Sequence, residues 1–190
     1  MKLTALGFSL LTAIPVIAST IEIPKTDLNG IYSLYRQLHQ APELSYHEAQ
    51  TAKILAAKLE ELGFNVTTDV GGHGVVALFK NGEGPTVMVR ADTDALPIIE
   101  ETGVDYASKV KVKDKNSNTV GVMHGCGHDI HMSSMIGTAQ QLINNKDKWQ
   151  GTLMMVAKPA EEVGAGAKRM LSEGLYSKYA QPDYVVGLHV

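Results

Sequence analysis

The feature that most constrains the fold of this chain is the alternation of helix-type and strand-type segments along it. Apolar side chains recur at helical spacing in four segments, 31–40, 48–62, 131–143 and 165–172. Short apolar runs typical of strands lie between and after them, at 65–70, 74–79, 86–89, 152–157 and 184–188. Alternating strands and helices predict an α/β sandwich with a largely parallel sheet. The polar, lysine-rich segment 105–119 is predicted to be an exposed loop or hairpin.

Composition narrows the class of protein. Of the 190 residues, 44% are hydrophobic and 19% are charged, which is typical of a globular chain and not of a disordered one. The formal net charge of −3 argues against a nucleic-acid partner or a polybasic membrane surface. Cys126 is the single cysteine, so an intrachain disulfide framework is excluded.

The N-terminus has the pattern of a secretory signal peptide. Met1-Lys2 is followed by an uncharged apolar run over 3–18 that ends in small residues, and the run is too short for a comfortable membrane span. We predict cleavage after Ala18, with 19–190 as the mature chain in a periplasmic or secreted location. An N-terminal anchor or a buried helix is the alternative interpretation. No other segment of the sequence is long and apolar enough to cross a bilayer.

Acidic and imidazole side chains follow three of the predicted strands directly. Asp92 and Asp94 follow the strand at 86–89, Glu161 and Glu162 follow the strand at 152–157, and His189 follows the last strand. In open α/β sheets, ligands bind beyond the carboxyl ends of the strands. These side chains are therefore predicted to share one site at one edge of the sheet. We expect neither a nucleic-acid partner nor, after signal cleavage, a membrane partner.

The segment HGCGHDIH lies between the first two of these strand ends. It carries five polar or reactive side chains, those of His124, Cys126, His128, Asp129 and His131. The glycines flanking Cys126 allow a tight turn, and a thiolate with an imidazole suits a soft or borderline divalent cation. A Cys-His nucleophilic site is the competing hypothesis. It would leave the two strand-end glutamates and the last histidine without a role, so a metal site is preferred.

The adjacent pair Glu161-Glu162 can divide its work, because one carboxylate can bind a cation while the other acts as a general base. Asp92 and Asp94 are predicted to orient the site from nearby. The remaining polar candidates are expected to lie outside the site. His39, His47 and His73 are interpreted as surface or loop histidines, and Glu43 as a capping or turn residue before the helix at 48–62.

Taken together, these motifs resemble the M20 family of metallopeptidases and amidohydrolases. The resemblance lies in HQAPELSYHE, RADTDALPIIEETG, MHGCGHDIHMSSMIGTA, KPAEEVGAGAKRML and GLHV. It is closest to the branch of N-acyl-amino-acid amidohydrolases that includes hippurate hydrolases and auxin-conjugate hydrolases. The sequence departs from the family pattern at Lys158, where glutamine is usual, and also at Gly125 and Thr93, where alanine and methionine are common. None of these changes removes a reactive group.

The resemblance implies a three-layer, zinc-exopeptidase-like catalytic domain that holds two divalent metal ions. Zinc or manganese would be the first choice, with cobalt or nickel as alternatives. The implied metal ligands are Cys126 (as the bridge), His128, Glu162 and His189. Glu161 would be the general base, and Asp92 and Asp94 would orient the site. The implied reaction is hydrolysis of the amide bond of an N-acyl amino acid, a small-molecule substrate.

The resemblance also implies a longer protein. Family members carry a second, smaller domain for dimerisation and closure over the substrate, and a last metal-binding histidine near the C-terminus. We therefore expect 19–190 to be the N-terminal portion of the catalytic domain, incomplete at its C-terminus and inactive alone, with a homodimeric full-length form. Two alternatives stay open. One is a non-catalytic product that binds metal or a partner, and the other is a thiol hydrolase that uses Cys126.

Overall fold

The structure is a computed structural model that describes residues 25–113 and 116–189. The predicted signal peptide, 1–18, lies outside the described residues and stays a prediction. The described helices are α1 (Lys25–Gln40), α2 (Ala49–Glu61), α3 (His128–Asn144) and α4 (Gly166–Ser172), with short helical turns at Lys146–Lys148 and Leu175–Tyr179. The described strands are β1 (Asn65–Thr67), β2 (Val75–Asn81), β3 (Thr86–Asp92), β4 (Lys111–Lys113), β5 (Thr119–Gly121), β6 (Gly151–Lys158) and β7 (Tyr184–Gly187).

The central sheet has the strand order β1-β2-β6-β3-β7. Strand β3 pairs in parallel with both β6 and β7, whereas β2 pairs antiparallel with β1 and β6. The predicted α/β class is confirmed, and the parallel pairing is confined to the three strands β6, β3 and β7. The difference follows from the connections: β1 and β2 are joined by a short loop, which suits antiparallel strands. The chain from β3 to β6 passes through α3, a crossover that suits parallel strands.

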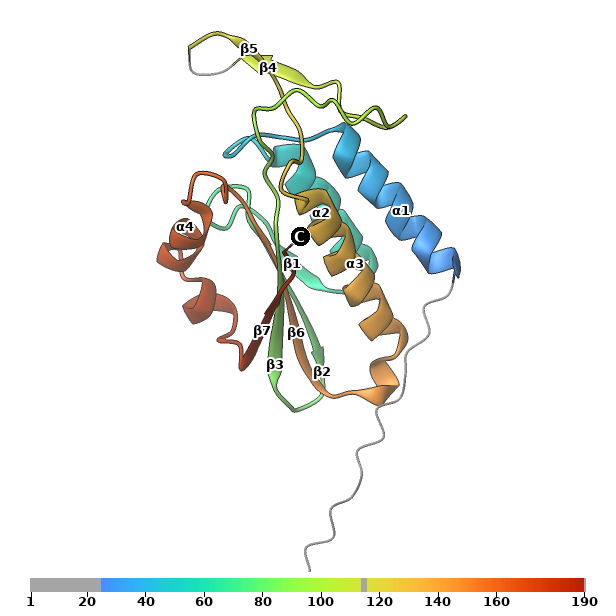
Figure 1. The fold of residues 1–190 in the computed structure, drawn as a ribbon. Coiled ribbons are helices and arrows are strands. Elements are labelled where there is room, and N and C mark those ends of the chain that lie inside the picture. The colour runs from blue at the N-terminus through green and yellow to red at the C-terminus, as the bar shows by residue number, and fades with distance from the viewer. Residues whose placement is uncertain (1–24, 114–115, 190) are drawn as a thin grey trace, which may run out of the picture.

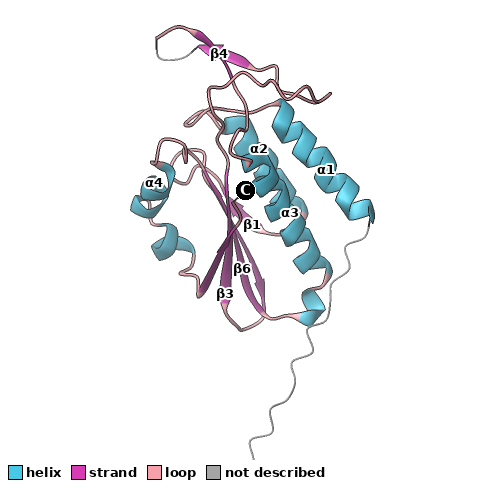
Figure 2. Ribbon diagram, viewed as in Figure 1, coloured by secondary structure: helices cyan, strands magenta, loops and turns pink. Residues whose placement is uncertain are grey.

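Helices cover both faces of this sheet, which makes the predicted three-layer sandwich. Helices α1, α2 and α3 lie on one face and α4 on the other (Figures 1 and 2). Strand β6 serves both layers: Met155 and Ala157 belong to the cluster under the three helices, and Met154 and Val156 to the cluster under α4. Because successive side chains point to opposite faces, a strand that is covered twice reads as a continuous apolar run. This explains why the segment 152–157 was recognisable in the sequence.

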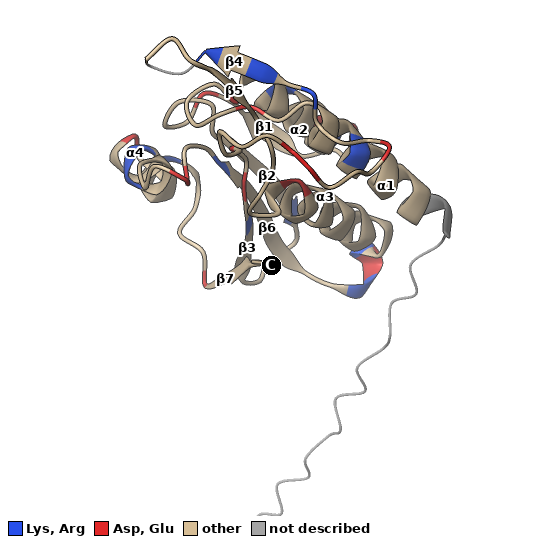
Figure 3. Ribbon diagram, turned by 45° about the horizontal axis from the view of Figure 1, so that its top comes forward, with Lys and Arg blue, Asp and Glu red and all other residues tan. Residues whose placement is uncertain are grey.

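Two parts of the fold are exposed. Strand β7 is an edge of the sheet, and Tyr184, Val185 and Val186 are exposed on it. Strands β4 and β5 form a separate hairpin that overlaps the lysine-rich segment 105–119, as predicted, and the lysines of β4 are blue on it in Figure 3. Among the described helices, none combines the length and the apolar character that crossing a membrane requires.

Glu43 caps the start of α2, as predicted. Its carboxylate accepts hydrogen bonds from the backbone N–H groups of Gln50, at 3.2 Å, and Thr51, at 2.8 Å. Amides in the first turn of a helix have no partner within the helix, so a carboxylate there both satisfies the donors and complements the helix dipole. His47 is exposed and His73 lies in a loop, so the interpretation of these two histidines is confirmed as well.

The interpretation of His39 as a surface or loop histidine is wrong. His39 lies in the last turn of α1 and is buried. Its Nδ1 is 2.6 Å from Oδ2 of Asp129 and its Nε2 is 3.0 Å from Oε1 of Glu100. The rings of Tyr35 and Tyr106 pack against it. The residue therefore joins α1 to the start of α3, through partners so distant along the chain that sequence spacing could not reveal them.

This buried cluster makes stability depend on pH in a defined direction. Burial alone would lower the pKa of His39, but hydrogen bonds with Glu100 and Asp129 raise it above its ordinary value. The stability that protonated His39 gains from these two carboxylates is fully present below the pKa of a free histidine, about 6.5. It is lost as the pH rises through the higher pKa of His39 in the folded protein. We expect His39→Gln to lower the melting temperature more at pH 6 than at pH 9. Thermal unfolding at both values checks this, with the exposed His47→Gln as control, and equal losses would contradict it.

Candidate metal centre

The carboxyl ends of three strands meet at one edge of the sheet, as the sequence predicted. Asp92 at the end of β3 lies opposite Lys158 at the end of β6, and Arg90 lies opposite Gly187 at the end of β7. Helix α3 begins with His128, a residue of the candidate site. The preceding residue, Gly127, has a φ of 69°, in the left-handed region that favours glycine, so the chain can turn sharply into the helix.

His128 is the centre of the site, and its ring is oriented by the backbone. The side chain is 1% exposed, and Nδ1 is 2.8 Å from the carbonyl oxygen of Asp94. This contact directs Nε2 toward Oε2 of Glu161, at 4.0 Å, and Oε1 of Glu162, at 3.9 Å. In the described part of the chain, Nε2 of His128 and Oε1 of Glu162 are buried without a hydrogen-bond partner. Buried polar atoms ordinarily have partners, so this pair fits a shared cation.

Asp94 contacts both the ring of His128 and the backbone of Glu162, which agrees with its predicted orienting role. Its Oδ2 accepts hydrogen bonds from the hydroxyl of Ser45, at 2.6 Å, and from the backbone N–H of Glu162, at 3.0 Å. Burial alone would raise the pKa of Asp94, but the His128 ring and these donors hold it well below its usual range. The carboxylate therefore stays ionised and stabilises the positions of its neighbours.

Cys126 lies beside Glu162. The side chain is half-buried, and a hydrogen bond with Glu162 together with burial raises the pKa of its thiol to about 11. Nucleophilic cysteines need a lowered pKa, so this surrounding disfavours the thiol-hydrolase hypothesis. A metal ion has the opposite effect, because a coordinating thiol is deprotonated outright. The position of Cys126 therefore suits a metal ligand better than a nucleophile.

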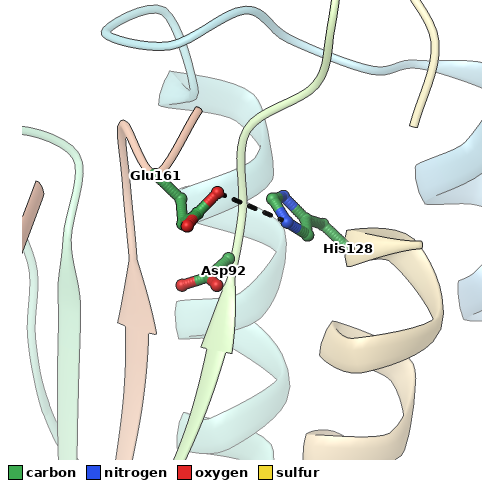
Figure 4. A group of neighbouring side chains, drawn as sticks. All are labelled: Asp92, His128 and Glu161. Carbon is green, nitrogen blue, oxygen red and sulfur yellow. Dashed lines mark ion pairs between the residues drawn. The ribbon is translucent and has the colours of Figure 1, made fainter. Parts of the chain in front are cut away.

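Asp92, His128 and Glu161 form a compact group at this edge, drawn in Figure 4. One possible ligand atom from each lies within 4.8 Å of the other two. However, Oδ1 of Asp92 is 2.6 Å from Nη1 of Arg90 and 2.9 Å from Nζ of Lys158. Two cations already neutralise this carboxylate, which agrees with an orienting role for Asp92. Lys158, where the family has glutamine, thus contributes one of these cations.

His189 is the site residue least closely held in the structure. It is exposed just beyond β7, and its ring centroid is 5.3 Å from that of His131. The His131 ring is in turn 5.5 Å from that of His128. A row of imidazoles therefore connects the end of β7 with the start of α3, and His189 joins the site through His131. His124 is buried nearby, and burial lowers its pKa to about 4, so it is neutral at ordinary pH.

Sequence reasoning missed several residues that support this site. Glu48 and Ser45 have no role in the prediction, and His131 is named there only as one side chain of the segment HGCGHDIH. All three lie within motifs that carry the family resemblance. The sequence places Glu48 only at the start of a helix, and in the structure it is wholly buried. A polar residue at an otherwise apolar helix position was the available signal, but only its burial distinguishes it from a solvated helix start.

The donor set of the site is chemically suited to a divalent metal. A thiol, an imidazole and carboxylates converge, and this combination is typical of zinc and related cations. Fold and site together define an α/β domain with a candidate metal site at the carboxyl edge of its parallel strands. The chain matches Peptidase family M20/M25/M40 over residues 88–190, and it belongs to that family. The resemblance recognised in its motifs is thereby confirmed.

Known relatives agree with this assignment. The chain is 42% identical over 164 residues to thermostable carboxypeptidase 2 of Saccharolobus solfataricus, covering 84% of this chain and 39% of the relative. It is 40% identical over 165 residues to the hippurate hydrolase of Campylobacter jejuni, covering 86% and 40%. The chain therefore spans about two fifths of the length of these curated relatives.

A solved structure supports the fold. The chain is similar to the Bacillus subtilis YXEP protein, described as a dinuclear metal-binding peptidase of the M20 family. The two share 36% sequence identity with a TM-score of 0.76, and the match covers 88% of this chain and 44% of that one. The predicted catalytic-domain fold is thus confirmed, and a solved relative is described as binding two metals.

Proposed function

We propose that the intact protein is a metal-dependent hydrolase that cleaves the amide bond of N-acyl amino acids, hippurate-like compounds among them. The observation that carries this proposal is the convergence of the His128 Nε2 with the carboxylates of Glu161 and Glu162, at 4.0 and 3.9 Å. The proposed metal ligands are Cys126, His128, Glu162 and His189. Bound there, a pair of divalent ions would supply a water of lowered pKa and would polarise the amide carbonyl.

The two glutamates differ in exposure, which supports different roles for them. The side chain of Glu161 is 37% exposed and that of Glu162 is 16% exposed. The more open carboxylate can reach a water molecule and a substrate, whereas the more buried one faces His128 and Cys126. Glu161 is therefore the proposed general base, which takes the proton of the attacking water and later delivers it to the leaving amine.

The names of two relatives support this substrate class. One is named hippurate hydrolase, and another is the N-acetyl-L-cysteine deacetylase of Bacillus subtilis. Both names describe removal of an acyl group from an amino acid. The same site chemistry, applied to such an amide here, would release a carboxylic acid and a free amino acid.

The direct test uses the intact protein, stripped of metal with a chelator and then reloaded with Zn²⁺ or Mn²⁺. We expect no release of glycine from hippurate by the stripped protein, recovery of turnover with either metal, and tight binding of two ions per chain. Turnover that persists without metal would overturn the proposal.

Two further measurements distinguish the proposed amidohydrolase from a thiol hydrolase and from a non-catalytic metal-binding product. Alkylation that abolishes turnover by metal-free protein would indicate a thiol hydrolase that uses Cys126. Tight binding of two ions, with no turnover of hippurate or of N-acetyl amino acids, would indicate a non-catalytic metal-binding product. Both results contradict the proposed amidohydrolase.

A further inference from the structure

The turn that carries the two glutamates is held in an uncommon conformation. Ala160 has a φ of 49°, in the left-handed region that residues with a side chain seldom adopt. Its carbonyl oxygen accepts hydrogen bonds from the N–H groups of Ala165 and Gly166, both at 3.1 Å. The backbone packs so closely here that a Cβ on Gly166 would lie 1.6 Å from the carbonyl oxygen of Pro159. Such a turn persists only where its surroundings hold it.

A buried carboxylate from another part of the chain holds this turn. Oε1 of Glu48 accepts a hydrogen bond from the backbone N–H of Ala160 at 2.7 Å, across 112 residues of sequence. Glu48 is 0% exposed. Asp94 makes the matching contact on the other side, to the N–H of Glu162 at 3.0 Å. The two carboxylates thus bind the two backbone amides that flank Glu161.

Helix α2 does not need this carboxylate for itself. The side chain of Glu48 makes no capping hydrogen bond to α2, although the residue occupies the N-cap position. The amides of Gln50 and Thr51 are bonded to Glu43 instead. Burying a carboxylate is costly, so a wholly buried one that does not cap its own helix calls for another role.

We propose that Glu48 is a positioning residue for Glu161. Its hydrogen bond to Ala160 keeps the turn in the left-handed conformation from which Glu161 projects into the site. The metal ligands do not depend on this contact, because the backbone of Glu162 is held separately by Asp94. This inference rests on the proposed function for its catalytic readout. A displacement of about 1 Å in such a support can cost roughly 100-fold in rate.

The test compares Glu48→Ala, Glu48→Gln and the control Glu60→Ala in the intact, metal-loaded protein. Glu60 is an exposed glutamate on the same helix. Glutamine keeps an oxygen acceptor for the Ala160 N–H, and Oε2 of Glu48 has no hydrogen-bond partner in the described residues. We expect Glu48→Ala to lower kcat on hippurate about 10–100-fold with KM and metal affinity nearly unchanged. Glu48→Gln and Glu60→Ala should stay within about threefold of wild type.

A second measurement needs no turnover. Amide hydrogen exchange in the peptide spanning 159–166 should be faster in Glu48→Ala than in wild type and normal in Glu48→Gln. A folded Glu48→Ala protein with wild-type kcat, or with unchanged exchange in this peptide, would overturn the inference. So would equal losses in the alanine and glutamine variants.

Two further outcomes are interpreted separately: a Glu48→Ala protein that does not fold, and a wild-type protein that lacks the proposed activity. If Glu48→Ala does not fold, Glu48→Asp replaces it, because the shorter side chain withdraws the acceptor while keeping the charge. The aspartate variant should then behave as expected for alanine, and wild-type behaviour would overturn the inference. If the wild-type protein hydrolyses no N-acyl amino acid, the proposed function fails by itself, and the exchange data with the metal affinities still decide the role of Glu48.

Discussion

Glu161→Gln is expected to lower kcat for hippurate by about 10²–10⁴-fold, the usual contribution of a general base. Glutamine has nearly the same shape but cannot accept the proton of the attacking water or deliver it to the leaving amine. The proposed ligands are untouched, so two metal ions should still bind with wild-type affinity. The measurement is steady-state hydrolysis together with metal titration of the intact protein.

Two further variants serve as controls for this experiment. Glu60→Gln removes an exposed carboxylate far from the site in sequence, and it should leave kcat unchanged. Glu162→Gln should weaken metal binding, because Glu162 is the more buried glutamate facing His128. Retained turnover in Glu161→Gln, with metal bound, would show that another group is the base.

His128→Ala is expected to weaken metal binding by more than about 100-fold, since even the loss of a group that only supports a ligand costs 10–100-fold. His128 is wholly enclosed, its Nδ1 is held by the Asp94 carbonyl oxygen, and its Nε2 faces both glutamates. Alanine leaves those two carboxylates without a cationic or metal-bound neighbour. Turnover should be lost at metal concentrations that saturate the wild type.

Titration with Zn²⁺ against a competing chelator measures this loss, and circular dichroism shows whether the variant is folded. His47→Ala is the matched control, because His47 is exposed and should not affect binding. A folded His128→Ala protein that binds two ions as tightly as wild type would contradict the assignment of the ligands.

Most of the elements could be predicted because their patterns are local. The apolar residues of α2 recur at helical spacing because one face of the helix is covered. The apolar run of β6 is continuous because both faces of the strand are covered. The antiparallel pairing of β2 with β6 could not be predicted, since it depends on β6, a strand far along the chain, entering the sheet between β2 and β3. Periodicity records burial and carries no information on which strand is the neighbour.

The candidate site divides in the same way. Glu161 and Glu162 were predictable because reactive residues directly after strands must meet at the carboxyl edge of parallel strands. His128 was predictable from its place in the glycine-flanked segment HGCGHDIH. The surrounding support was not predictable. His39 binds Asp129 and Glu48 binds Ala160 across long stretches of sequence, and neither residue differs locally from an ordinary helix-end histidine or helix-start glutamate.

The sequence by itself therefore determined the α/β class, the family and the side chains with the chemistry to hold a metal and move a proton. These are properties of residue type and short-range spacing. Only the tertiary structure decided which carboxylates are solvated and which are buried, and which backbone amides they hold. Burial and hydrogen bonding between distant segments arise when the layers pack, and they decide that Asp92 is neutralised by Arg90 and Lys158 while Glu161 faces the open site.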